Sequence, residues 1–472
     1  MGSPSLKKNF IYKSILTLSS YLMAFITFPY VSRILGVERL GLVNFVDNTV
    51  SYFLLFATMG IGVLGVREIA SVRDNLDKRN RVYSDLFGLN IFFTILTLIV
   101  YIVCISLIPR FHQYYELFYI GTAKIIFTAF LVEWFFSGIE DFKYITIRSV
   151  AVKSIYIASV FLFVKDANDY VLYWVLTVGV IVVNSLINSI YIHRFVRFEF
   201  KDCLRFNYLR PNITLGVYML MTSMYLTFNV MYLGLISDNT QVGYYTAAHK
   251  LYMVILGFFS AFTQVMLPRM SSLMSEGKDL RFQELVDLSF FVMFMCSVPL
   301  ITCSMVLAPK IILILSGPGY EGAVLPMRII MPAVFSVGIA QVLAVQVLMP
   351  IKKDKVLLTT SVIGALVALS VNLLVVPLLG SVGSAWVLLI SETAVTISYI
   401  VYILRHRLVR LPIKYLLQSI VCAFPCFMIC LQCGKIGNPF ISLIVAFIAG
   451  GGCWVMLCYL LGGDMVRKLM RR

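Results

Sequence analysis

The sequence predicts an all-α polytopic membrane protein with about 14 transmembrane helices. Three observations predict this class: 60% of the 472 residues are hydrophobic, only 13% are charged, and the mean hydropathy is +0.91. A water-soluble chain of this length could not bury so much apolar surface and still cover itself with polar groups. Lipid must therefore be the solvent for most of the chain.

About fourteen stretches have the length and apolar composition of helices that cross a membrane, and they are too long for barrel strands. They lie at 11–35, 40–66, 83–108, 115–138, 144–164, 170–192, 213–236, 242–267, 288–307, 323–348, 356–379, 382–404, 413–431 and 440–461. Helices 1–6 and 7–12 are predicted to form two six-helix lobes, 1–210 and 211–410. Two extra helices and a basic cytoplasmic tail occupy 411–472.

Sequence landmarks bound the predicted helices of the first lobe. PYVSRILG ends the first helix, LGLVNFVD opens the second, and Arg67 closes the second. EWFFSGIEDFKYITIRS joins the fourth helix to the fifth at 133–149. The connection near 194–212, after the sixth helix, is the longest, and it leaves no room for a soluble catalytic or nucleotide-binding domain.

The second lobe carries similar landmarks. VGYYTAAHK begins the eighth helix, LPRMS ends it, and GPGYEGA precedes the tenth. A shift of about 202 residues places Val242-Gly243 on Leu40-Gly41 and Arg269 on Arg67, as a parallel repeat would require. In such transporters the substrate path lies between the halves. The ninth helix, at 288–307, is among the shortest predictions, and the last two helices stand outside the repeat.

Basic residues alternate from loop to loop. Most of the 39 lysines and arginines fall in segments that are cytoplasmic if the N-terminus is cytoplasmic. This pattern predicts a multi-pass protein of the bacterial inner membrane with both termini in the cytoplasm. The net charge of +16 therefore reflects topology and contact with membrane lipids, and no nucleic acid partner is expected. The ten cysteines suggest neither a disulfide framework nor a metal site.

Charged residues inside the predicted helices cost about 2.5–3.5 kcal/mol each near the bilayer centre, so they point to function. The cations are Lys13, Lys124, Lys153, Lys250 and Arg328, and the carboxylates are Asp47, Glu133 and Glu392. Cations are in excess. This balance suits an anionic substrate such as a diphosphate, whose oxygens accept charge-assisted hydrogen bonds.

Structural explanations stay open for the same residues. Lys124, Lys250 and Arg328 could be neutralised by internal ion pairs, with Asp47 or Glu392 as partners. Glu133, Lys13 and other groups near the inner boundary could reach the lipid headgroups. Serine and threonine on polar helix faces could serve only as contacts between helices.

The PYVSRILG and EWFFSGIEDFKYITIRS blocks are the most specific of these landmarks. With the shorter motifs, they make roughly the first 400 residues resemble the Wzx-type polysaccharide repeat-unit flippases. These belong to the multidrug/oligosaccharidyl-lipid/polysaccharide exporter (MOP) superfamily. The resemblance implies two six-helix bundles in a V around a cationic cavity, with transport by alternating access. The implied substrates are undecaprenyl-diphosphate-linked oligosaccharides for O-antigen or capsule, handled alongside other polysaccharide-assembly proteins.

The resemblance implies a transporter with no catalytic residues, no cofactor and no metal, and a coupling ion that is H⁺ or Na⁺. Combined with the intramembrane charges, it suggests five substrate-binding cations: Arg33, Lys124, Lys153, Lys250 and Arg328. Asp47 and Glu392 are candidates for coupling or gating. Glu392 lies about 15 Å deep in its predicted helix and could bind the ion or instead pair with a lysine.

Three other functions were weighed against this one. A lipid II flippase of the same superfamily shares the cationic cavity and the helix number, and it stays open as an alternative. A drug/cation antiporter would favour carboxylates and aromatic walls in its cavity. A polysaccharide polymerase or ligase would be expected to have a large outer loop with catalytic groups. The sequence does not identify the sugar.

Overall fold

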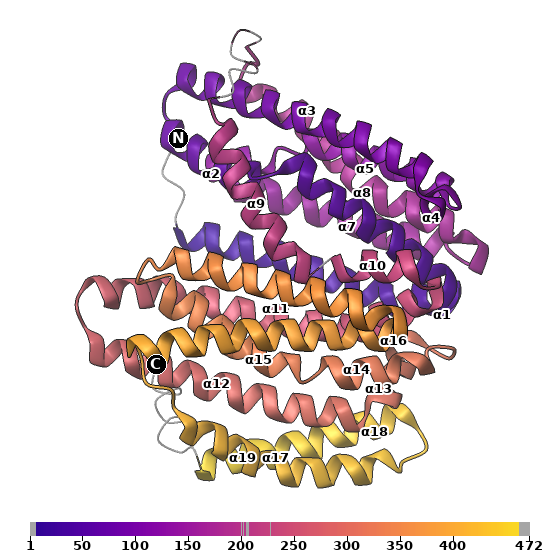
Figure 1. The fold of residues 1–472 in the computed structure, drawn as a ribbon, viewed down its shortest axis with the longest axis vertical. Coiled ribbons are helices and arrows are strands. Elements are labelled where there is room, and N and C mark those ends of the chain that lie inside the picture. The colour runs from indigo at the N-terminus through magenta and orange to yellow at the C-terminus, as the bar shows by residue number, and fades with distance from the viewer. Residues whose placement is uncertain (1–5, 200, 202, 204–206, 227, 462–472) are drawn as a thin grey trace. The chain divides into compact units, whose positions relative to one another are not determined.

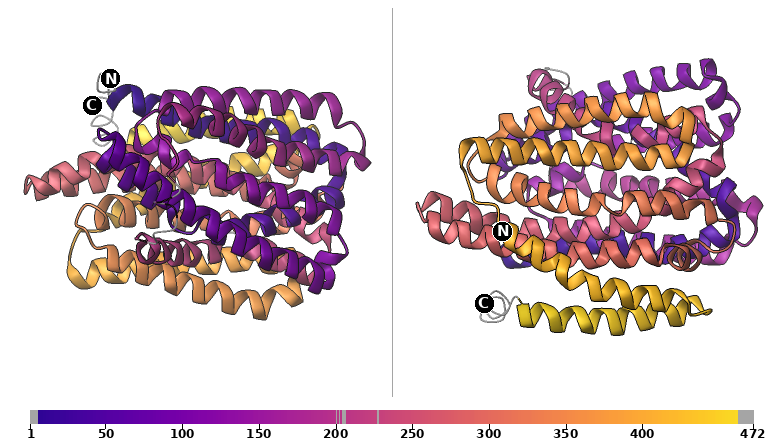
Figure 2. Two further views of the ribbon diagram at one scale, coloured as in Figure 1. Left: turned by 90° about the horizontal axis from the view of Figure 1, so that it is seen from above. Right: turned by 60° about the horizontal axis from the view of Figure 1, so that its bottom comes forward.

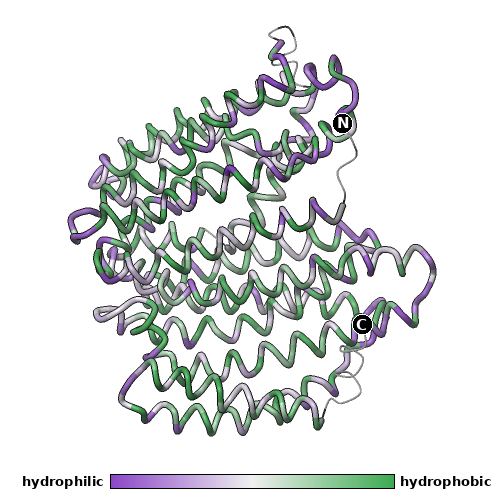
Figure 3. Tube along the Cα trace, turned by 180° about the vertical axis from the view of Figure 1, so that it is seen from behind, coloured by the Kyte–Doolittle hydropathy of each residue, from purple (hydrophilic) through white to green (hydrophobic). Residues whose placement is uncertain are grey.

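The computed structural model describes residues 6–199, 201, 203, 207–226 and 228–461, which form helices joined by short turns (Figure 1). In this part of the chain, eleven helical segments are long and apolar enough to cross a membrane. Figure 3 shows hydrophobic residues along the helices and hydrophilic residues gathered at their ends. The predicted all-α polytopic membrane fold is therefore confirmed. The basic tail at 462–472 lies outside the described residues.

Contacts divide the chain into two compact units, Met1–Leu235 (unit 1) and Ile236–Arg472 (unit 2). The helices of unit 1 are α1 (Leu6–Thr58), α2 (Ile61–Val72), α3 (Leu76–Leu107), α4 (Pro109–His112), α5 (Tyr115–Phe130), α6 (Glu133–Gly138), α7 (Phe142–Phe163), α8 (Tyr170–Tyr191), α9 (Leu209–Leu226) and α10 (Phe228–Ile236), which ends at the boundary. Those of unit 2 are α11 (Asn239–Ser275), α12 (Asp279–Val306), α13 (Ala308–Ser316), α14 (Val324–Ile330), α15 (Ala333–Gln341), α16 (Asp354–His406), α17 (Ile413–Gly434), α18 (Pro439–Val445) and α19 (Gly451–Leu461). The repeat-based lobe boundary at 210 stays a prediction.

Two helices are far longer than one membrane crossing requires. α1 and α16 have 53 residues each, or about 80 Å, against about 30 Å of hydrocarbon. Each contains a glycine with positive φ, Gly36 at 70° in α1 and Gly380 at 55° in α16. Glycine tolerates this backbone because it lacks a Cβ. Each long helix thus contains two of the predicted crossings, but the total number of crossings stays a prediction.

In unit 1, α1 packs against α3, α5 and α7, and α8 packs against α5 and α7. The short helix α6 buries Trp134, Phe135 and Phe136 in an aromatic and aliphatic cluster with α2. Contact with α2 is close, because a Cβ on Gly65 would lie 2.5 Å from the Trp134 ring. This packing fixes α6, and with it Glu133 at its first residue.

In unit 2, α12 packs against α15 and α17, and α16 packs against α14 and α15. The last helices, α17 to α19, are drawn in yellow in Figure 2 and contact one another. Lys310 of α13 holds the end of α17, because its ammonium donates to the carbonyls of Cys433 (3.0 Å) and Ile436 (2.5 Å) and to the hydroxyl of Ser442 (2.9 Å). A cation is favourable at a helix C-terminus.

Candidate functional site

The candidate site lies in unit 1, where the predicted fourth crossing is broken. α5 ends at Phe130, Val132 has a φ of 35°, and α6 begins at Glu133. A positive φ is unfavourable for a β-branched residue, so the surrounding packing must hold it. Inside a membrane, the carbonyl groups freed by such a break need donors from the protein itself.

Polar side chains of α3 and α8 supply these donors. Three amide or hydroxyl groups bond to carbonyl oxygens at the end of α5: Asn188 to Leu131, Ser185 to Phe127 (2.6 Å) and Asn90 to Ala129 (3.2 Å). Broken helices that line a polar site are a recurring feature of transporters. The break therefore explains why polar residues gather here.

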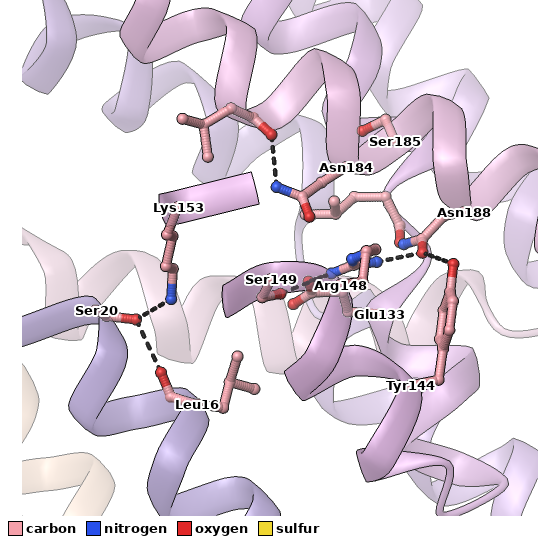
Figure 4. A network of polar contacts seen from close by, with 12 residues as sticks. Leu16, Ser20, Glu133, Tyr144, Arg148, Ser149, Lys153, Asn184, Ser185 and Asn188 are labelled. Carbon is pink, nitrogen blue, oxygen red and sulfur yellow. Dashed lines mark hydrogen bonds and ion pairs between the residues drawn. The ribbon is translucent and has the colours of Figure 1, made fainter. Parts of the chain in front are cut away.

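Arg148 of α7 lies at the centre of the site (Figure 4) and is only 5% exposed. Its guanidinium pairs with the Glu133 carboxylate and donates to the side-chain oxygen of Asn188 and to the Ser149 hydroxyl. The Tyr144 hydroxyl donates to the same Asn188 oxygen, at 2.9 Å. Asn188 thus links the helix break to Arg148: its amide nitrogen donates to the Leu131 carbonyl, and its amide oxygen accepts from the guanidinium.

Lys153 lies just over one turn along α7 from Arg148. Its ammonium donates to the hydroxyls of Ser19 (3.0 Å) and Ser20 (2.7 Å) on α1, as Figure 4 shows for Ser20. In the described part of the chain, no carboxylate lies within ion-pair distance of Lys153. Its direct partners are therefore neutral hydroxyls, and the Glu133 carboxylate, which is paired with Arg148, acts on it only from beyond ion-pair distance.

Lys124 of α5 is 7% exposed and does form the internal ion pair that the sequence left open. Its ammonium lies 2.5 Å from the Asp47 carboxylate of α1 and 2.9 Å from the Ser51 hydroxyl. It also lies 5.9 Å from the centre of the Trp174 ring, within range of a cation–π contact. The two predicted site residues Lys124 and Asp47 are thus brought together.

Among the charged groups of this region, three cations stand against two carboxylates. Lys124 and Arg148 each have an acidic partner, and Lys153 has hydroxyl partners. The arrangement can hold one negatively charged group without displacing a carboxylate. Charge-assisted hydrogen bonds to a phosphate oxygen are the strongest contacts such a cation can make.

The other predicted site residues lie elsewhere in their units. Arg33, on α1, is exposed and donates to the Pro29 carbonyl within its own helix. In unit 2, Lys250 is half-buried in α11, and Arg328 is exposed on α14 and donates to the Met305 carbonyl at 3.1 Å. Glu392 of α16 is 5% exposed. Lys250, Arg328 and Glu392 thus belong to the other unit, and a cavity between the two lobes stays a prediction.

Sequence reasoning missed Arg148 and Asn188 as site residues. The sequence analysis leaves Arg148 out of the charges inside the helices and places Glu133 near the inner boundary, whereas the two are paired and Arg148 is buried. A signal was available, because both residues belong to the EWFFSGIEDFKYITIRS block. Asn188 had none, since a single asparagine in an apolar helix gives no pattern.

Curated relatives match most of the chain. A candidate O-antigen transporter of Escherichia coli (strain K12) is 26% identical over 413 residues, which cover 86% of this chain and 98% of the relative. A candidate O-antigen transporter of Shigella dysenteriae is 26% identical over 409 residues, covering 85% of this chain and 99% of the relative. Both therefore correspond to this chain almost from end to end.

Solved structures share the fold. The lipid II flippase MurJ, in an inward closed conformation, matches with a TM-score of 0.79 at 14% identity, covering 97% of this chain and 100% of that one. An inward-facing multidrug resistance MATE transporter of the MOP superfamily matches with a TM-score of 0.64 at 14% identity, covering 85% and 98%. The model of the polysaccharide biosynthesis protein family matches residues 6–274, more than half of the sequence. The chain belongs to the polysaccharide biosynthesis protein family and has the fold of the MOP-superfamily transporters.

Proposed function

We propose that this membrane protein is a flippase that moves undecaprenyl-diphosphate-linked oligosaccharides across the inner membrane for O-antigen or capsule synthesis. Family membership and the candidate O-antigen transporters among its relatives support the polysaccharide role. The transporter fold supports movement of a substrate by alternating access. An H⁺ or Na⁺ gradient as the energy source is part of the proposal and is tested separately.

The observation that carries the proposal is that the Lys153 ammonium is hydrogen-bonded to neutral hydroxyls. An ammonium has three donors, and in the described part of the chain two of them go to Ser19 and Ser20. A phosphate oxygen can take the third donor or replace a hydroxyl, and it gains a full opposite charge in doing so. At Lys124 or Arg148 the same phosphate would first have to displace a carboxylate.

In this proposal, Lys153 contacts the diphosphate of the lipid-linked substrate. Arg148, paired with Glu133, supports the helix break through Asn188, and Lys124, paired with Asp47, holds α5 against α1. Arg33, Lys250 and Arg328 remain proposed contacts for other parts of the head group.

The test is flipping of a defined undecaprenyl-diphosphate oligosaccharide in proteoliposomes. Lys153→Met is expected to lower the rate by about 10- to 100-fold, since a charged hydrogen bond contributes about 1.5–3 kcal/mol. Lys153→Arg keeps the charge and should retain most of the rate. Lys143→Met is the matched control, because Lys143 lies exposed on the same helix. Equal rates for Lys153→Met and the control would overturn the assignment.

A lipid II flippase is the second candidate, because the fold similarity to MurJ extends over almost the whole chain. The same vesicles should therefore be loaded with lipid II in a parallel arm. Flipping of lipid II without the oligosaccharide would replace the substrate we propose. Export of a cationic dye, with neither lipid moved, would instead assign the chain to the drug/cation antiporters.

A further inference from the structure

Unit 2 contains a groove with a volume of about 640 Å³ between the two arms of α16. One arm precedes Gly380 and the other follows it. The lining residues are Lys355, Val356, Thr359, Thr360, Ile363, Ile397, Ser398, Val401, Tyr402, Arg405 and His406. This volume is in the range of sites that hold small molecules.

The fold of α16 explains why the groove is at this end. The helix reverses at Gly380, where φ is 55° and ψ is −126°. Near this joint the arms are in close contact, since a Cβ on Gly383 would lie 2.8 Å from the Val375 carbonyl oxygen. The lining residues come from the opposite ends of both arms, so the groove lies away from the joint.

The groove has a charged mouth and an apolar interior. Lys355, in the first turn of α16, and Arg405 and His406, in its last turn, are exposed at the mouth. The apolar residues Ile363, Ile397 and Val401 lie further along the arms and are also exposed. Lys355 and Ile363 are eight residues apart, which is about 12 Å along a helix.

The charged side chains that line the groove are all basic. In the described part of the chain, no acidic residue lines the groove. Hydroxyls from Thr359, Ser398 and Tyr402 also line the groove. Those of Thr359 and Ser398 donate to the carbonyls of Lys355 and Ala394 at 2.8 Å, and their oxygens can still accept a hydrogen bond from a glycerol hydroxyl. The His406 ring stacks on the Tyr402 ring, with centroids 4.1 Å apart, which forms one side of the mouth.

We propose that this groove binds an anionic phospholipid of the leaflet that the charge pattern predicts to be cytoplasmic. The phosphate is held by Lys355 and Arg405, and one acyl chain lies along Ile363, Ile397 and Val401. A depth of about 12 Å fits within one leaflet, which is about half of a 30 Å hydrocarbon layer. The groove is formed by residues of unit 2 alone, and this proposal does not depend on which substrate the protein transports.

The test uses the full-length protein in mixed micelles, with retained lipids counted by native mass spectrometry. Phosphatidylglycerol and phosphatidylcholine are the two probes. The variant Lys355→Gln/Arg405→Gln is expected to bind phosphatidylglycerol about 30-fold more weakly, given the usual contribution of each cation near a membrane surface. The control Lys353→Gln/Arg410→Gln removes the same charge from exposed residues at the same end that do not line the groove, and it should retain the lipid.

A second variant examines the apolar part. Val401→Trp fills the interior without changing charge, and it should also release phosphatidylglycerol while thermal unfolding stays near that of the unmodified protein. Equal loss in the control pair would mean general surface attraction and would overturn the site. Equal retention of phosphatidylcholine, displacement by millimolar inorganic phosphate, or preferential binding of undecaprenyl phosphate would each overturn the proposed occupant.

Discussion

The charged side chains within the helices have different partners in the two units. In unit 1, Lys124 and Arg148 are each paired with a carboxylate, and Lys153 is held by hydroxyls. In unit 2, Glu392 is buried beside the Tyr252 hydroxyl, and no lysine or arginine of the described residues lies within ion-pair distance of it. Among the described residues, Lys153 is therefore a cation whose hydrogen-bond partners are neutral, and Glu392 is a buried carboxyl group with a neutral partner.

This difference suggests a division of labour. A cation with neutral partners favours an anionic substrate, whereas a buried carboxyl group without a cation is stable only if it is protonated or binds a positive ion. We expect the diphosphate to be recognised in unit 1 and the coupling ion in unit 2. Four variants test the comparison, from the largest expected effect on stability to the smallest.

Arg148→Met should have the largest effect. It leaves Glu133 and Asn188 without their partner beside the helix break, and loss of one member of a buried pair costs about 3–5 kcal/mol. The free energy of unfolding in mixed micelles is the measurement. The double variant Arg148→Met/Glu133→Leu should recover most of the loss, because no uncompensated charge remains. A single variant as stable as the exposed control Lys143→Met would show that the pair does not support the fold.

Lys124→Met should destabilise by less, about 2–3 kcal/mol, because the Lys124 ammonium bonds only to Asp47 and Ser51, whereas the Arg148 guanidinium has three side-chain partners, one of them the buried Asn188. Lys124→Met/Asp47→Asn should recover both the unfolding free energy and the flipping rate, which would make the pair structural. Recovery of stability without flipping would instead assign Lys124 to the substrate.

Lys310→Met examines a cation of unit 2 that has carbonyl partners. Loss of its bonds to the end of α17 should cost about 1–2 kcal/mol, measured by the same unfolding experiment. Lys435→Met is the control, since Lys435 is exposed near the same helix end. Equal stability of the two variants would contradict a role for Lys310 in holding α17.

Glu392→Gln should change the unfolding free energy by less than about 0.5 kcal/mol, because it removes a carboxyl group that has no cationic partner. Its effect should appear in transport: stimulation of flipping by an imposed proton or sodium gradient should disappear. The control Glu284→Gln alters an exposed carboxylate of the same unit. Unchanged gradient dependence in Glu392→Gln would exclude this residue from coupling.

The class of fold could be predicted because hydropathy and helix length follow directly from composition. The two joints were located as well, since the predicted helices 11–35 and 40–66 meet around Gly36, and those at 356–379 and 382–404 meet around Gly380. The absence of an open loop at these joints could not be predicted, because only the positive φ of each glycine marks the place where one helix ends and the next begins. The ninth predicted helix, at 288–307, corresponds to the 28-residue α12, because polar residues before 288 extend the helix beyond the apolar stretch.

The site was predicted in part. Lys124, Lys153 and Asp47 were found because charge is conspicuous in an apolar helix, and the alternative of a Lys124–Asp47 pair could be stated. Their geometry could not be predicted, because it depends on how α1, α5 and α7 pack. Arg148 was not predicted as a site residue because it lies close to the start of a predicted helix, where an arginine side chain ordinarily reaches water.

At Gly36 in α1 and Gly380 in α16, two predicted crossings are joined without an open turn between them. A protease, a maleimide reagent or an inserted epitope needs several residues of accessible backbone, and Gly36 and Gly380 offer none outside the helices. Reporters for mapping the sidedness of this protein therefore belong in the turns at 164–166 and 317–320. If a reporter inserted at either glycine gives no signal, the reason would be the lack of accessible backbone there. The result would not tell which face of the membrane the glycine occupies.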